Sequence, residues 1–162
     1  TVLRFATAFG LSPRMRFDLT VNEFIRELAL GNELVVFDAD TWRPYCHVED
    51  FARLIECVLK APEELIINQV FNAGGDENNA TKRMIVDKIL EKVPSGKVKY
   101  KDFGSDPRNY IVDFSKVRNA LDFTPKFSIE MGIDEILKEI NTGNLDAVDI
   151  NKNFHGNYDI VL

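Results

Sequence analysis

Arg43 is the side chain whose type and setting best suit the binding of an anion. It follows Trp42 in an extended segment that leads into a helix opened by two acids, Glu49 and Asp50. A guanidinium fixed on a strand can donate two parallel hydrogen bonds to a phosphate or a carboxylate. An ordinary surface arginine in a weak salt bridge has the same local sequence, so both interpretations stay open at this point.

The segments that must position Arg43 are a strand and the helix behind it. Glu49 and Asp50 carry negative charge where the helix macrodipole favours it. Apolar residues then recur with helical spacing, namely Phe51, Leu54, Ile55, Val58 and Leu59. We therefore expect this helix to be buried along one face and to anchor the strand that carries Arg43.

Strands and helices alternate through the rest of the chain, which predicts an α/β fold. Thr20 and Glu23 fit a capping box that opens one helix, whereas Thr81 and Ser128 are candidate N-caps of two later helices. The helix after Ser128 has a long apolar face and is the last regular element that the sequence predicts. Strands are predicted where β-rich or apolar stretches occur, at residues 1–7, 34–37, 70–75 and 98–101.

The composition predicts a soluble globular domain. The 162 residues are 45% hydrophobic and 28% charged, and no apolar run is long enough to cross a bilayer. A net charge of −6 argues against general nucleic-acid binding. The two cysteines are too few for a disulfide scaffold and no secretory signal is visible, so we expect reduced thiols and a cytoplasmic location. Only His47 and His155 could offer imidazole ligands, which predicts no metal site.

Residues 43–52, Arg-Pro-Tyr-Cys-His-Val-Glu-Asp-Phe-Ala, carry a resemblance to a known family. They resemble the R-D/P-aromatic-x-H/Y-V-x-D-x-A segment of the NAD-dependent sugar epimerases and dehydratases, which are extended short-chain dehydrogenases/reductases. Three other stretches agree with the family in the right order: residues 4–10, 70–75 and 106–125. The resemblance covers residues 1–140 and only the family's C-terminal half. It implies the substrate-binding portion of an extended Rossmann-type epimerase, with short strands and four or five helices.

The resemblance also implies which residues would bind a nucleotide-diphosphate sugar. Arg43 and Arg108 would clamp the diphosphate, whose charge suits two planar guanidinium groups. Ala6 would lie beside the nicotinamide of NAD or NADP. The remaining implied substrate contacts are Thr7, which stands where the family often has Asn, and Thr20, Val21, Asn22 and Phe37 near the ribose or base. For three of these a structural role is the alternative: Thr20 as a cap, Asn22 as a solvated side chain and Phe37 as part of the core.

The catalytic groups of the family are not found in this sequence. The family transfers a hydride to NAD with a tyrosine base from a Y-x-x-x-K motif and holds the cofactor on a glycine-rich turn. No glycine-rich turn follows the first strand, and no tyrosine here has a lysine four residues later. The chain also begins at Thr1, inside a predicted strand. We therefore expect a piece of a longer protein, with no catalytic residue of its own and no activity alone.

These observations predict a substrate-binding fragment of an NAD-dependent nucleotide-sugar epimerase or dehydratase. Residues 1–140 would bind the sugar nucleotide and dock on the protein's own Rossmann domain, and a homodimer is possible. Residues 141–162 would form a tail or a partner-binding extension. The alternatives are a non-catalytic module that binds a nucleotide sugar or a protein, and a regulator built on the same scaffold.

Overall fold

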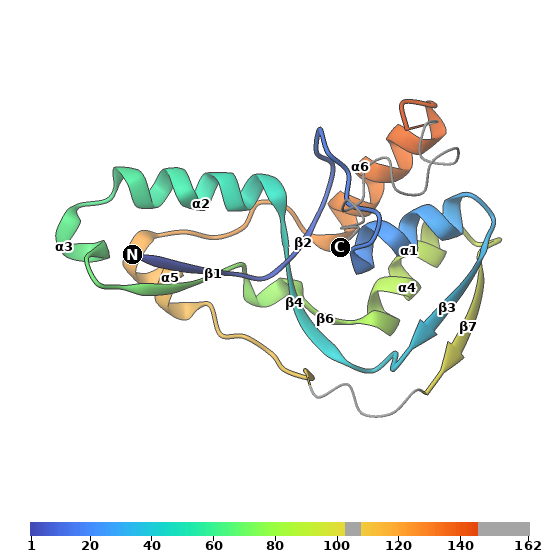
Figure 1. Cartoon of the computed structure of the whole chain (residues 1–162), viewed down its shortest axis with the longest axis horizontal. Coiled ribbons are helices and arrows are strands. Elements are labelled where there is room, and N and C mark those ends of the chain that lie inside the picture. The colour runs from blue at the N-terminus through green and yellow to red at the C-terminus, as the bar shows by residue number, and fades with distance from the viewer. Residues whose placement is uncertain (103–107, 146–162) are drawn as a thin grey trace, which may run out of the picture.

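The computed structural model describes residues 1–102 and 108–145. The chain forms an elongated molecule whose two ends are joined by a short central sheet (Figure 1). In this sheet β4 (Trp42–His47) lies between two partners, running parallel to β2 (Thr7–Phe9) and antiparallel to β6 (Asn79–Thr81). Arg43 therefore lies on the strand that connects the two ends of the molecule.

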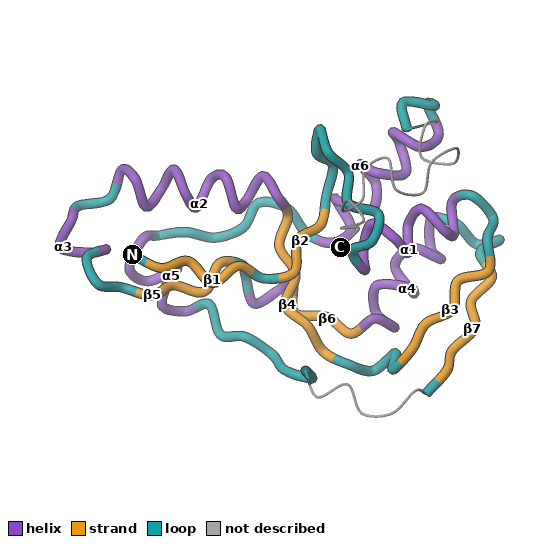
Figure 2. Tube along the Cα trace, viewed as in Figure 1, coloured by secondary structure: helices purple, strands orange, loops and turns teal. Residues whose placement is uncertain are grey.

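One end, which we call the sheet lobe, is built on two parallel strands. β1 (Val2–Phe5) pairs with β5 (Val70–Ala73), and a long helix runs alongside both strands (Figure 2). The helices of this lobe are α2 (Val48–Lys60), the single turn α3 (Glu63–Ile66) and α5 (Ser115–Leu121). Side chains from α2, β5 and α5 form its hydrophobic cluster.

The other end, which we call the helical lobe, contains three helices and a second pair of parallel strands. Its helices are α1 (Thr20–Ala29), α4 (Lys82–Lys92) and α6 (Ile129–Asn141). Its strands are β3 (Glu33–Phe37) and β7 (Lys97–Lys101), and a 3-10 turn, η1 (Asp76–Asn78), lies between the two lobes in sequence. The larger of the two hydrophobic clusters fills this lobe.

The strand predicted over residues 1–7 is two strands with different partners. β1 ends at Phe5 and pairs with β5, whereas β2 begins at Thr7 and pairs with β4. Ala6 lies at the break, and its N–H still donates to the carbonyl of Ala73 at 3.1 Å. The chain passes from one sheet to the next at Ala6, because tertiary pairing rather than local sequence decides where a strand changes partner.

The capping box predicted at Thr20 and Glu23 is wrong. α1 begins at Thr20 itself, its N-cap is Leu19, and no side chain caps it. The N–H of Glu23 donates to the carbonyl of Leu19 at 2.8 Å, as in any first helical turn. The other two predicted caps are confirmed, since the side chains of Thr81 and Ser128 each accept a hydrogen bond from the N–H three residues later.

Helix α2 confirms the predicted element but not its predicted burial. Leu54 and Val58 are buried within the cluster of the sheet lobe. Ile55 is 43% exposed and Leu59 is 80% exposed, so both lie on a part of the helix that the described residues leave uncovered. The prediction of one continuous buried stripe is therefore wrong for these two residues, because the stripe wraps around two sides of the helix.

The α/β fold class is confirmed, with six α-helices in the described residues against the four or five expected. The strand predicted at residues 98–101 is present as β7. Asp38 and Asp122 adopt left-handed backbone with φ of 50° and 49°, a conformation that favours glycine. None of the described helices is long and apolar enough to cross a bilayer. The predicted tail, except for residues 141–145, and His155 lie outside the described residues.

Candidate functional site

A cavity of about 410 Å³ lies where β1 passes into β2 beside β4. Ala6, the residue expected to meet the cofactor, lines this cavity together with Phe5 and Pro44. The opposite wall is the segment that precedes α5, and the lining is completed by Arg4, Asn72 and residues 110–114. Concave sites of this size with a few polar groups are typical of small-molecule binding.

Arg43 contacts that opposite wall of the cavity. Its Nη1 donates to the carbonyl of Trp42 at 2.8 Å, and its guanidinium lies 5.3 Å from the centre of the Tyr110 ring. The wall is tied to β4, because the N–H of Trp42 donates to Asn109 Oδ1 at 2.9 Å and the N–H of Tyr110 donates to the Trp42 carbonyl at 3.3 Å. Arg108 is exposed and directly precedes this tie. The fold thus brings the segments of the two predicted clamp arginines together.

Tyr45 is a site candidate that sequence reasoning did not select. It is 1% exposed. Burial raises the pKa of Tyr45 to about 12, while the charge of Arg43 and a hydrogen bond with Thr20 act in the opposite direction. The phenol therefore lies close to two residues that were predicted, from distant segments, to bind the sugar nucleotide. A tyrosine among core aromatics carries no local sequence signal of this kind.

The other predicted substrate residues lie in different settings. Thr7 is half-buried and stands opposite Tyr45 in the β2–β4 register. Val21 is fully buried at the start of α1, next to the half-buried Thr20. Phe37 is 41% exposed, 6.0 Å from Lys101 Nζ, so it does not belong to the core. The structure places Thr7 and Thr20 near Tyr45 and puts Phe37 at the end of β3, by the turn that leads to β4.

Asn22 is 2% exposed, and both polar atoms of its side chain have partners within the chain. Its Oδ1 accepts from the N–H of Gly10, and its Nδ2 donates to the carbonyl of Arg16, each at 3.1 Å. Asn22 therefore holds the loop between β2 and α1. The alternative of a solvated side chain is wrong, because Asn22 is buried, whereas the contact of Asn22 with the base or ribose stays a prediction.

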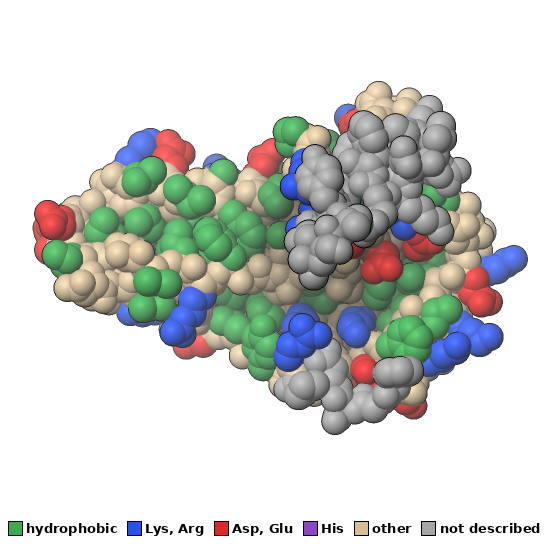
Figure 3. All heavy atoms as spheres, viewed as in Figure 1, with side chains coloured by type: hydrophobic (Ala, Val, Ile, Leu, Met, Phe, Trp, Pro, Cys, Tyr) green, Lys and Arg blue, Asp and Glu red, His purple; other side chains and the backbone are tan. Residues whose placement is uncertain are grey.

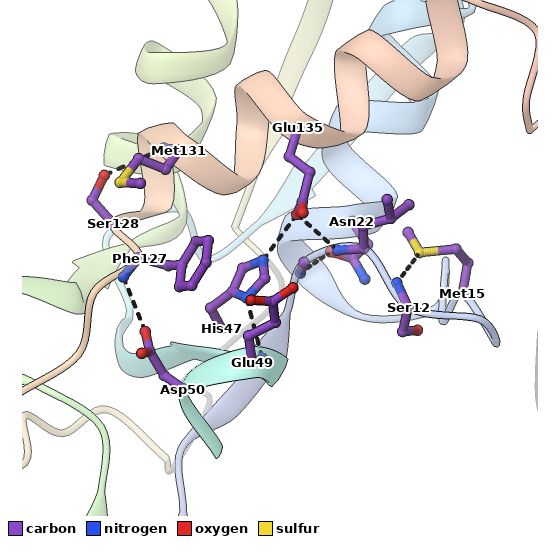
Figure 4. Close-up of polar contacts among 12 residues, drawn as sticks. Ser12, Met15, Asn22, His47, Glu49, Asp50, Phe127, Ser128, Met131 and Glu135 are labelled. Atoms are coloured by element: carbon purple, nitrogen blue, oxygen red, sulfur yellow. Dashed lines mark hydrogen bonds and ion pairs between the residues drawn. The ribbon is translucent and has the colours of Figure 1, made fainter. Parts of the chain in front are cut away.

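A pair formed by the buried His47 and the half-buried Glu135 lies between this loop and α6 (Figure 4). His47 is fully buried, and its Nε2 lies 2.9 Å from Glu135 Oε2. Its Nδ1 accepts from the N–H of Glu49 at 3.2 Å and so caps α2. The same Glu135 oxygen accepts from the N–H of Leu11 at 3.1 Å. Sequence reasoning quoted His47 within its motif but gave it no role.

The cavity also contains a carboxylate that stays ionised. Asp113 lines it, and the N–H and hydroxyl of Ser115 donate to this side chain at 2.7 and 3.0 Å. These hydrogen bonds lower the pKa of Asp113. The described residues hold no group of three or more His, Cys, Asp or Glu side chains that could bind a metal ion.

Comparisons with known proteins agree with the resemblance seen in the sequence. Residues 1–74 match the family model described as the NAD dependent epimerase/dehydratase family. Over 136 residues the chain is 26% identical to an uncharacterised UDP-glucose epimerase, YtcB, of Bacillus subtilis. Over 137 residues it is 28% identical to a UDP-glucuronate 4-epimerase of Thermodesulfobacterium geofontis. Each match covers 82% of this chain but only 41% and 40% of the relative.

Solved structures give the same result for the fold. The UDP-glucuronic acid 4-epimerase of Bacillus cereus, crystallised with UDP-glucuronic acid and NAD, superposes with a TM-score of 0.74 at 25% identity. It is matched over 88% of this chain and 45% of its own. The UDP-glucose 4-epimerase of Thermotoga maritima, solved with UDP-glucose, has a TM-score of 0.74 at 23% identity, with 88% and 46% covered. The chain therefore spans less than half the length of the relatives it matches.

Proposed function

Because this chain belongs to the NAD-dependent epimerase/dehydratase family, we propose that it is the substrate-binding portion of an enzyme that epimerises or dehydrates a nucleotide-diphosphate sugar. The solved relatives that resemble it were crystallised with UDP-glucuronic acid or UDP-glucose, so UDP sugars are the first class to test. A dTDP-glucose 4,6-dehydratase of similar fold makes dTDP sugars the second.

The observation that carries this proposal is the placement of Arg43 on β4, where its guanidinium lies against Tyr110 in the segment that follows Arg108. Tyr45 lies on the same strand, and its phenol is buried beside Thr20. Arg43 and Thr20 lie close enough to Tyr45 to act on its ionisation. We assign Tyr45 to the nucleotide subsite together with Thr7, Thr20 and Val21.

Arg43 and Arg108 are the proposed clamp on the diphosphate. Arg43 is already oriented, because its guanidinium is held by the Trp42 carbonyl and the face of Tyr110. Arg108 precedes Asn109, whose side chain fastens that segment to β4. Two guanidinium groups from separate segments can each donate charge-assisted hydrogen bonds to one diphosphate. Phe37 is the proposed aromatic contact of the base, since its ring is partly exposed.

The cavity beside Ala6 fits the nicotinamide end of NAD or NADP. A Cβ at Gly74 would come within 2.7 Å of the Phe114 ring, so the glycine lets Phe114, which lines the cavity together with Ala6, pack closely against it. The bound cofactor would supply hydride transfer, and Ala6 and Phe5 would shape the floor beneath its ring. The phosphates of the cofactor require a glycine-rich turn, which we assign to a separate nucleotide-binding half of the protein.

The sheet lobe offers that half a docking surface. Among the described residues β1 pairs only with β5, which leaves its other edge open to a further strand. Exposed apolar side chains lie on the adjoining elements, and Figure 3 shows hydrophobic atoms spread over this lobe. They are Val2, Phe5, Ile55, Leu59, Leu65 and Ile67. An apolar surface of this extent marks an interface. A homodimer and a cytoplasmic location stay predictions.

Binding of UDP-glucose and dTDP-glucose to the intact protein, measured by calorimetry, tests the clamp. Arg43→Ala and Arg108→Ala should each weaken binding by about 1–3 kcal/mol, because each removes a hydrogen bond to a charged group. Arg118→Ala is the matched control, since Arg118 is an exposed arginine of α5 that pairs with Asp76 of η1. Unchanged affinity in both clamp variants would overturn the assignment. Binding without turnover in the presence of NAD would favour the non-catalytic module.

Tyr45→Phe tests the nucleotide subsite separately. The substitution removes a hydroxyl that hydrogen-bonds with Thr20, so the free protein should lose about 1 kcal/mol or less. Affinity for the nucleotide sugar should fall by about 1 kcal/mol, the net value of one hydrogen bond. Equal affinity of wild type and variant would remove Tyr45 from the site.

A further inference from the structure

We propose that His47 and Glu135 form a positioning pair that holds the two walls of the sugar-nucleotide site at a fixed separation; this rests on the function proposed above. One wall is β4, which carries Arg43 and Tyr45. The other is the start of α1, which carries Thr20 and Val21. In this proposal neither His47 nor Glu135 contacts the sugar nucleotide itself. It acts through the loop of residues 10–19, which leads from β2 into α1.

The contacts of His47 determine where its proton lies. Nδ1 accepts from the N–H of Glu49, so it carries no proton. Nε2 must then carry the proton and donate it to Glu135 Oε2 at 2.9 Å. His47 is the residue directly after Cys46 on β4 and lies four residues from Arg43. Its hydrogen bond to Glu135 therefore ties the Arg43 strand to α6.

Packing leaves the His47 ring no room to turn. Phe127 stacks on it with ring centres 4.3 Å apart, and Phe9 meets it edge-on at 5.3 Å. The backbone closes the remaining side, because a Cβ at Gly10 would come within 2.1 Å of His47 Nε2. A buried ring confined in this way transmits the position of its strand to its hydrogen-bond partner.

Glu135 extends the connection to the loop before α1. Its Oε2 accepts from the N–H of Leu11 as well as from His47. The adjacent N–H, that of Gly10, donates to Asn22 in the first turns of α1. Figure 4 shows Glu135 reaching down from α6 between His47 and the Asn22 region. Two hydrogen bonds of Glu135, the Gly10–Leu11 backbone and the hydrogen bond of Gly10 to Asn22 thus connect β4 to α1.

The chemistry of Glu135 makes this assignment testable, because one oxygen accepts both hydrogen bonds. Gln can supply one such oxygen, whereas Ala supplies none. Glu135→Gln is therefore the conservative variant that should keep the loop in place. Asp134→Ala is the matched control, since it removes an anion from the neighbouring position of α6 and breaks only an exposed ion pair with Lys92.

Hydrogen–deuterium exchange of the intact protein tests the pair without any ligand. In Glu135→Ala, peptides covering residues 9–19 should exchange at least about tenfold faster, the effect of losing a hydrogen bond to a charged group. Peptides from the far end of α2 should be unaffected. Glu135→Gln and Asp134→Ala should exchange like wild type. Equal exchange of residues 9–19 in Glu135→Ala and Asp134→Ala would overturn the proposal.

Imidazole ¹⁵N chemical shifts of His47 give a second, spectroscopic test. We expect the wild-type ring to show a protonated Nε2 and an unprotonated Nδ1. A proton found on Nδ1 at neutral pH would overturn the assignment, because the ring could not then both cap α2 and donate to Glu135. In Glu135→Ala the chemical shift of Nε2–H should change to that of a group without this hydrogen bond. In Glu135→Gln it should stay close to the wild-type value.

Calorimetry with UDP-glucose and dTDP-glucose then measures the consequence for the site. Glu135→Ala should bind about tenfold more weakly, and Glu135→Gln should recover most of that loss. If the wild-type protein binds neither sugar nucleotide, the proposed function fails, whereas the exchange and ¹⁵N results still decide whether the pair positions the loop. If Glu135→Ala binds the sugar nucleotide with wild-type affinity although residues 9–19 exchange faster, the pair does not position the binding site and the proposal is overturned.

Discussion

The two lobes bury their hydrophobic side chains to different degrees. In the helical lobe α1, α4 and α6 direct their apolar stripes into one cluster, and Ile25, Ile85 and Ile133 are fully buried there. In the sheet lobe α2 buries Leu54 but leaves Leu59 80% exposed. The exposed apolar side chains of the sheet lobe lie on neighbouring elements, β1, α2 and α3, rather than singly.

This difference indicates which part of the molecule is complete. A lobe whose helices bury their apolar faces against one another needs no further partner to remove those faces from water. A two-stranded sheet with one open edge and an apolar helix face beside it is marginal in water. We infer that the helical lobe folds as a unit and that the sheet lobe is stabilised by the proposed nucleotide-binding half.

Asp50 is the residue that joins the two lobes. It lies at the start of α2, is fully buried, and pairs with Arg53. Its carboxylate also accepts from the N–H groups of Lys126 and Phe127, at 2.9 and 3.0 Å, just before α6 begins. Asp50 therefore adds a side-chain connection to the central sheet that joins the lobes, and a substitution at this position tests the comparison between them.

Asp50→Ala should have the largest effect on stability. It leaves two backbone N–H groups and a half-buried guanidinium without the buried carboxylate that they bind, which costs about 3–5 kcal/mol. Urea unfolding measures the loss. Asp50→Asn keeps one oxygen acceptor and should recover part of it. A loss below about 1 kcal/mol for Asp50→Ala would show that the lobes are joined mainly by other contacts.

A matched pair of core substitutions sharpens the comparison. Leu28 of α1 and Leu54 of α2 are 1% and 0% exposed, so Leu→Ala at either site should cost about 2–5 kcal/mol. Hydrogen exchange should then separate them. Leu54→Ala should expose amides of β1, β5 and α2 only, whereas Leu28→Ala should loosen α1, α4 and α6. Equal loss of protection in both lobes from Leu54→Ala would mean that they unfold as one unit.

The elements that the sequence predicted well are those with local signals. Thr81 and Ser128 cap their helices as expected. Each hydroxyl accepts from the N–H only three residues later, so the cap depends on local sequence alone. The stripe of α6 is buried as expected from its spacing. The capping box at Thr20 failed, since Leu19 starts that helix without any side-chain cap. Spacing alone cannot tell which of several candidate turns begins a helix.

The site depended on contacts that local patterns do not contain. Resemblance to the family pointed to Arg43 and Arg108, but Tyr45 became a candidate only when its hydroxyl was found buried beside Thr20. The His47–Glu135 pair joins residues 88 positions apart. The exposure of Leu59 was missed for a related reason. A stripe predicts that a helix face will be covered, but it does not say by which part of the protein.

Leu59→Gln tests whether that face is covered in the complete protein. In the 162-residue chain the change should alter stability by less than about 0.5 kcal/mol, because Leu59 is exposed. In a protein that carries the proposed nucleotide-binding half, it should cost about 2 kcal/mol, the value of burying a leucine. Met131→Gln, at a 49% exposed position of α6, should be neutral in both. A neutral Leu59→Gln in the longer protein would place the docking surface elsewhere.

The loss of unfolding free energy at alkaline pH should be the smallest of these effects. It reports on Tyr45, which lies in the central sheet between the lobes. Burial raises the pKa of Tyr45 from 10.0 to about 12, so the unfolded chain releases this proton first. The contribution of Tyr45 is fully present below pH 10 and is lost as the pH rises toward 12. At pH 11 wild type should have lost about 1.4 kcal/mol through this group, one pKa unit of linkage, and Tyr45→Phe should not. Urea unfolding at pH 9 and 11 measures the difference. Equal losses in both proteins would mean that water reaches the phenol, and the burial of Tyr45 would then be no reason to place a ligand contact there.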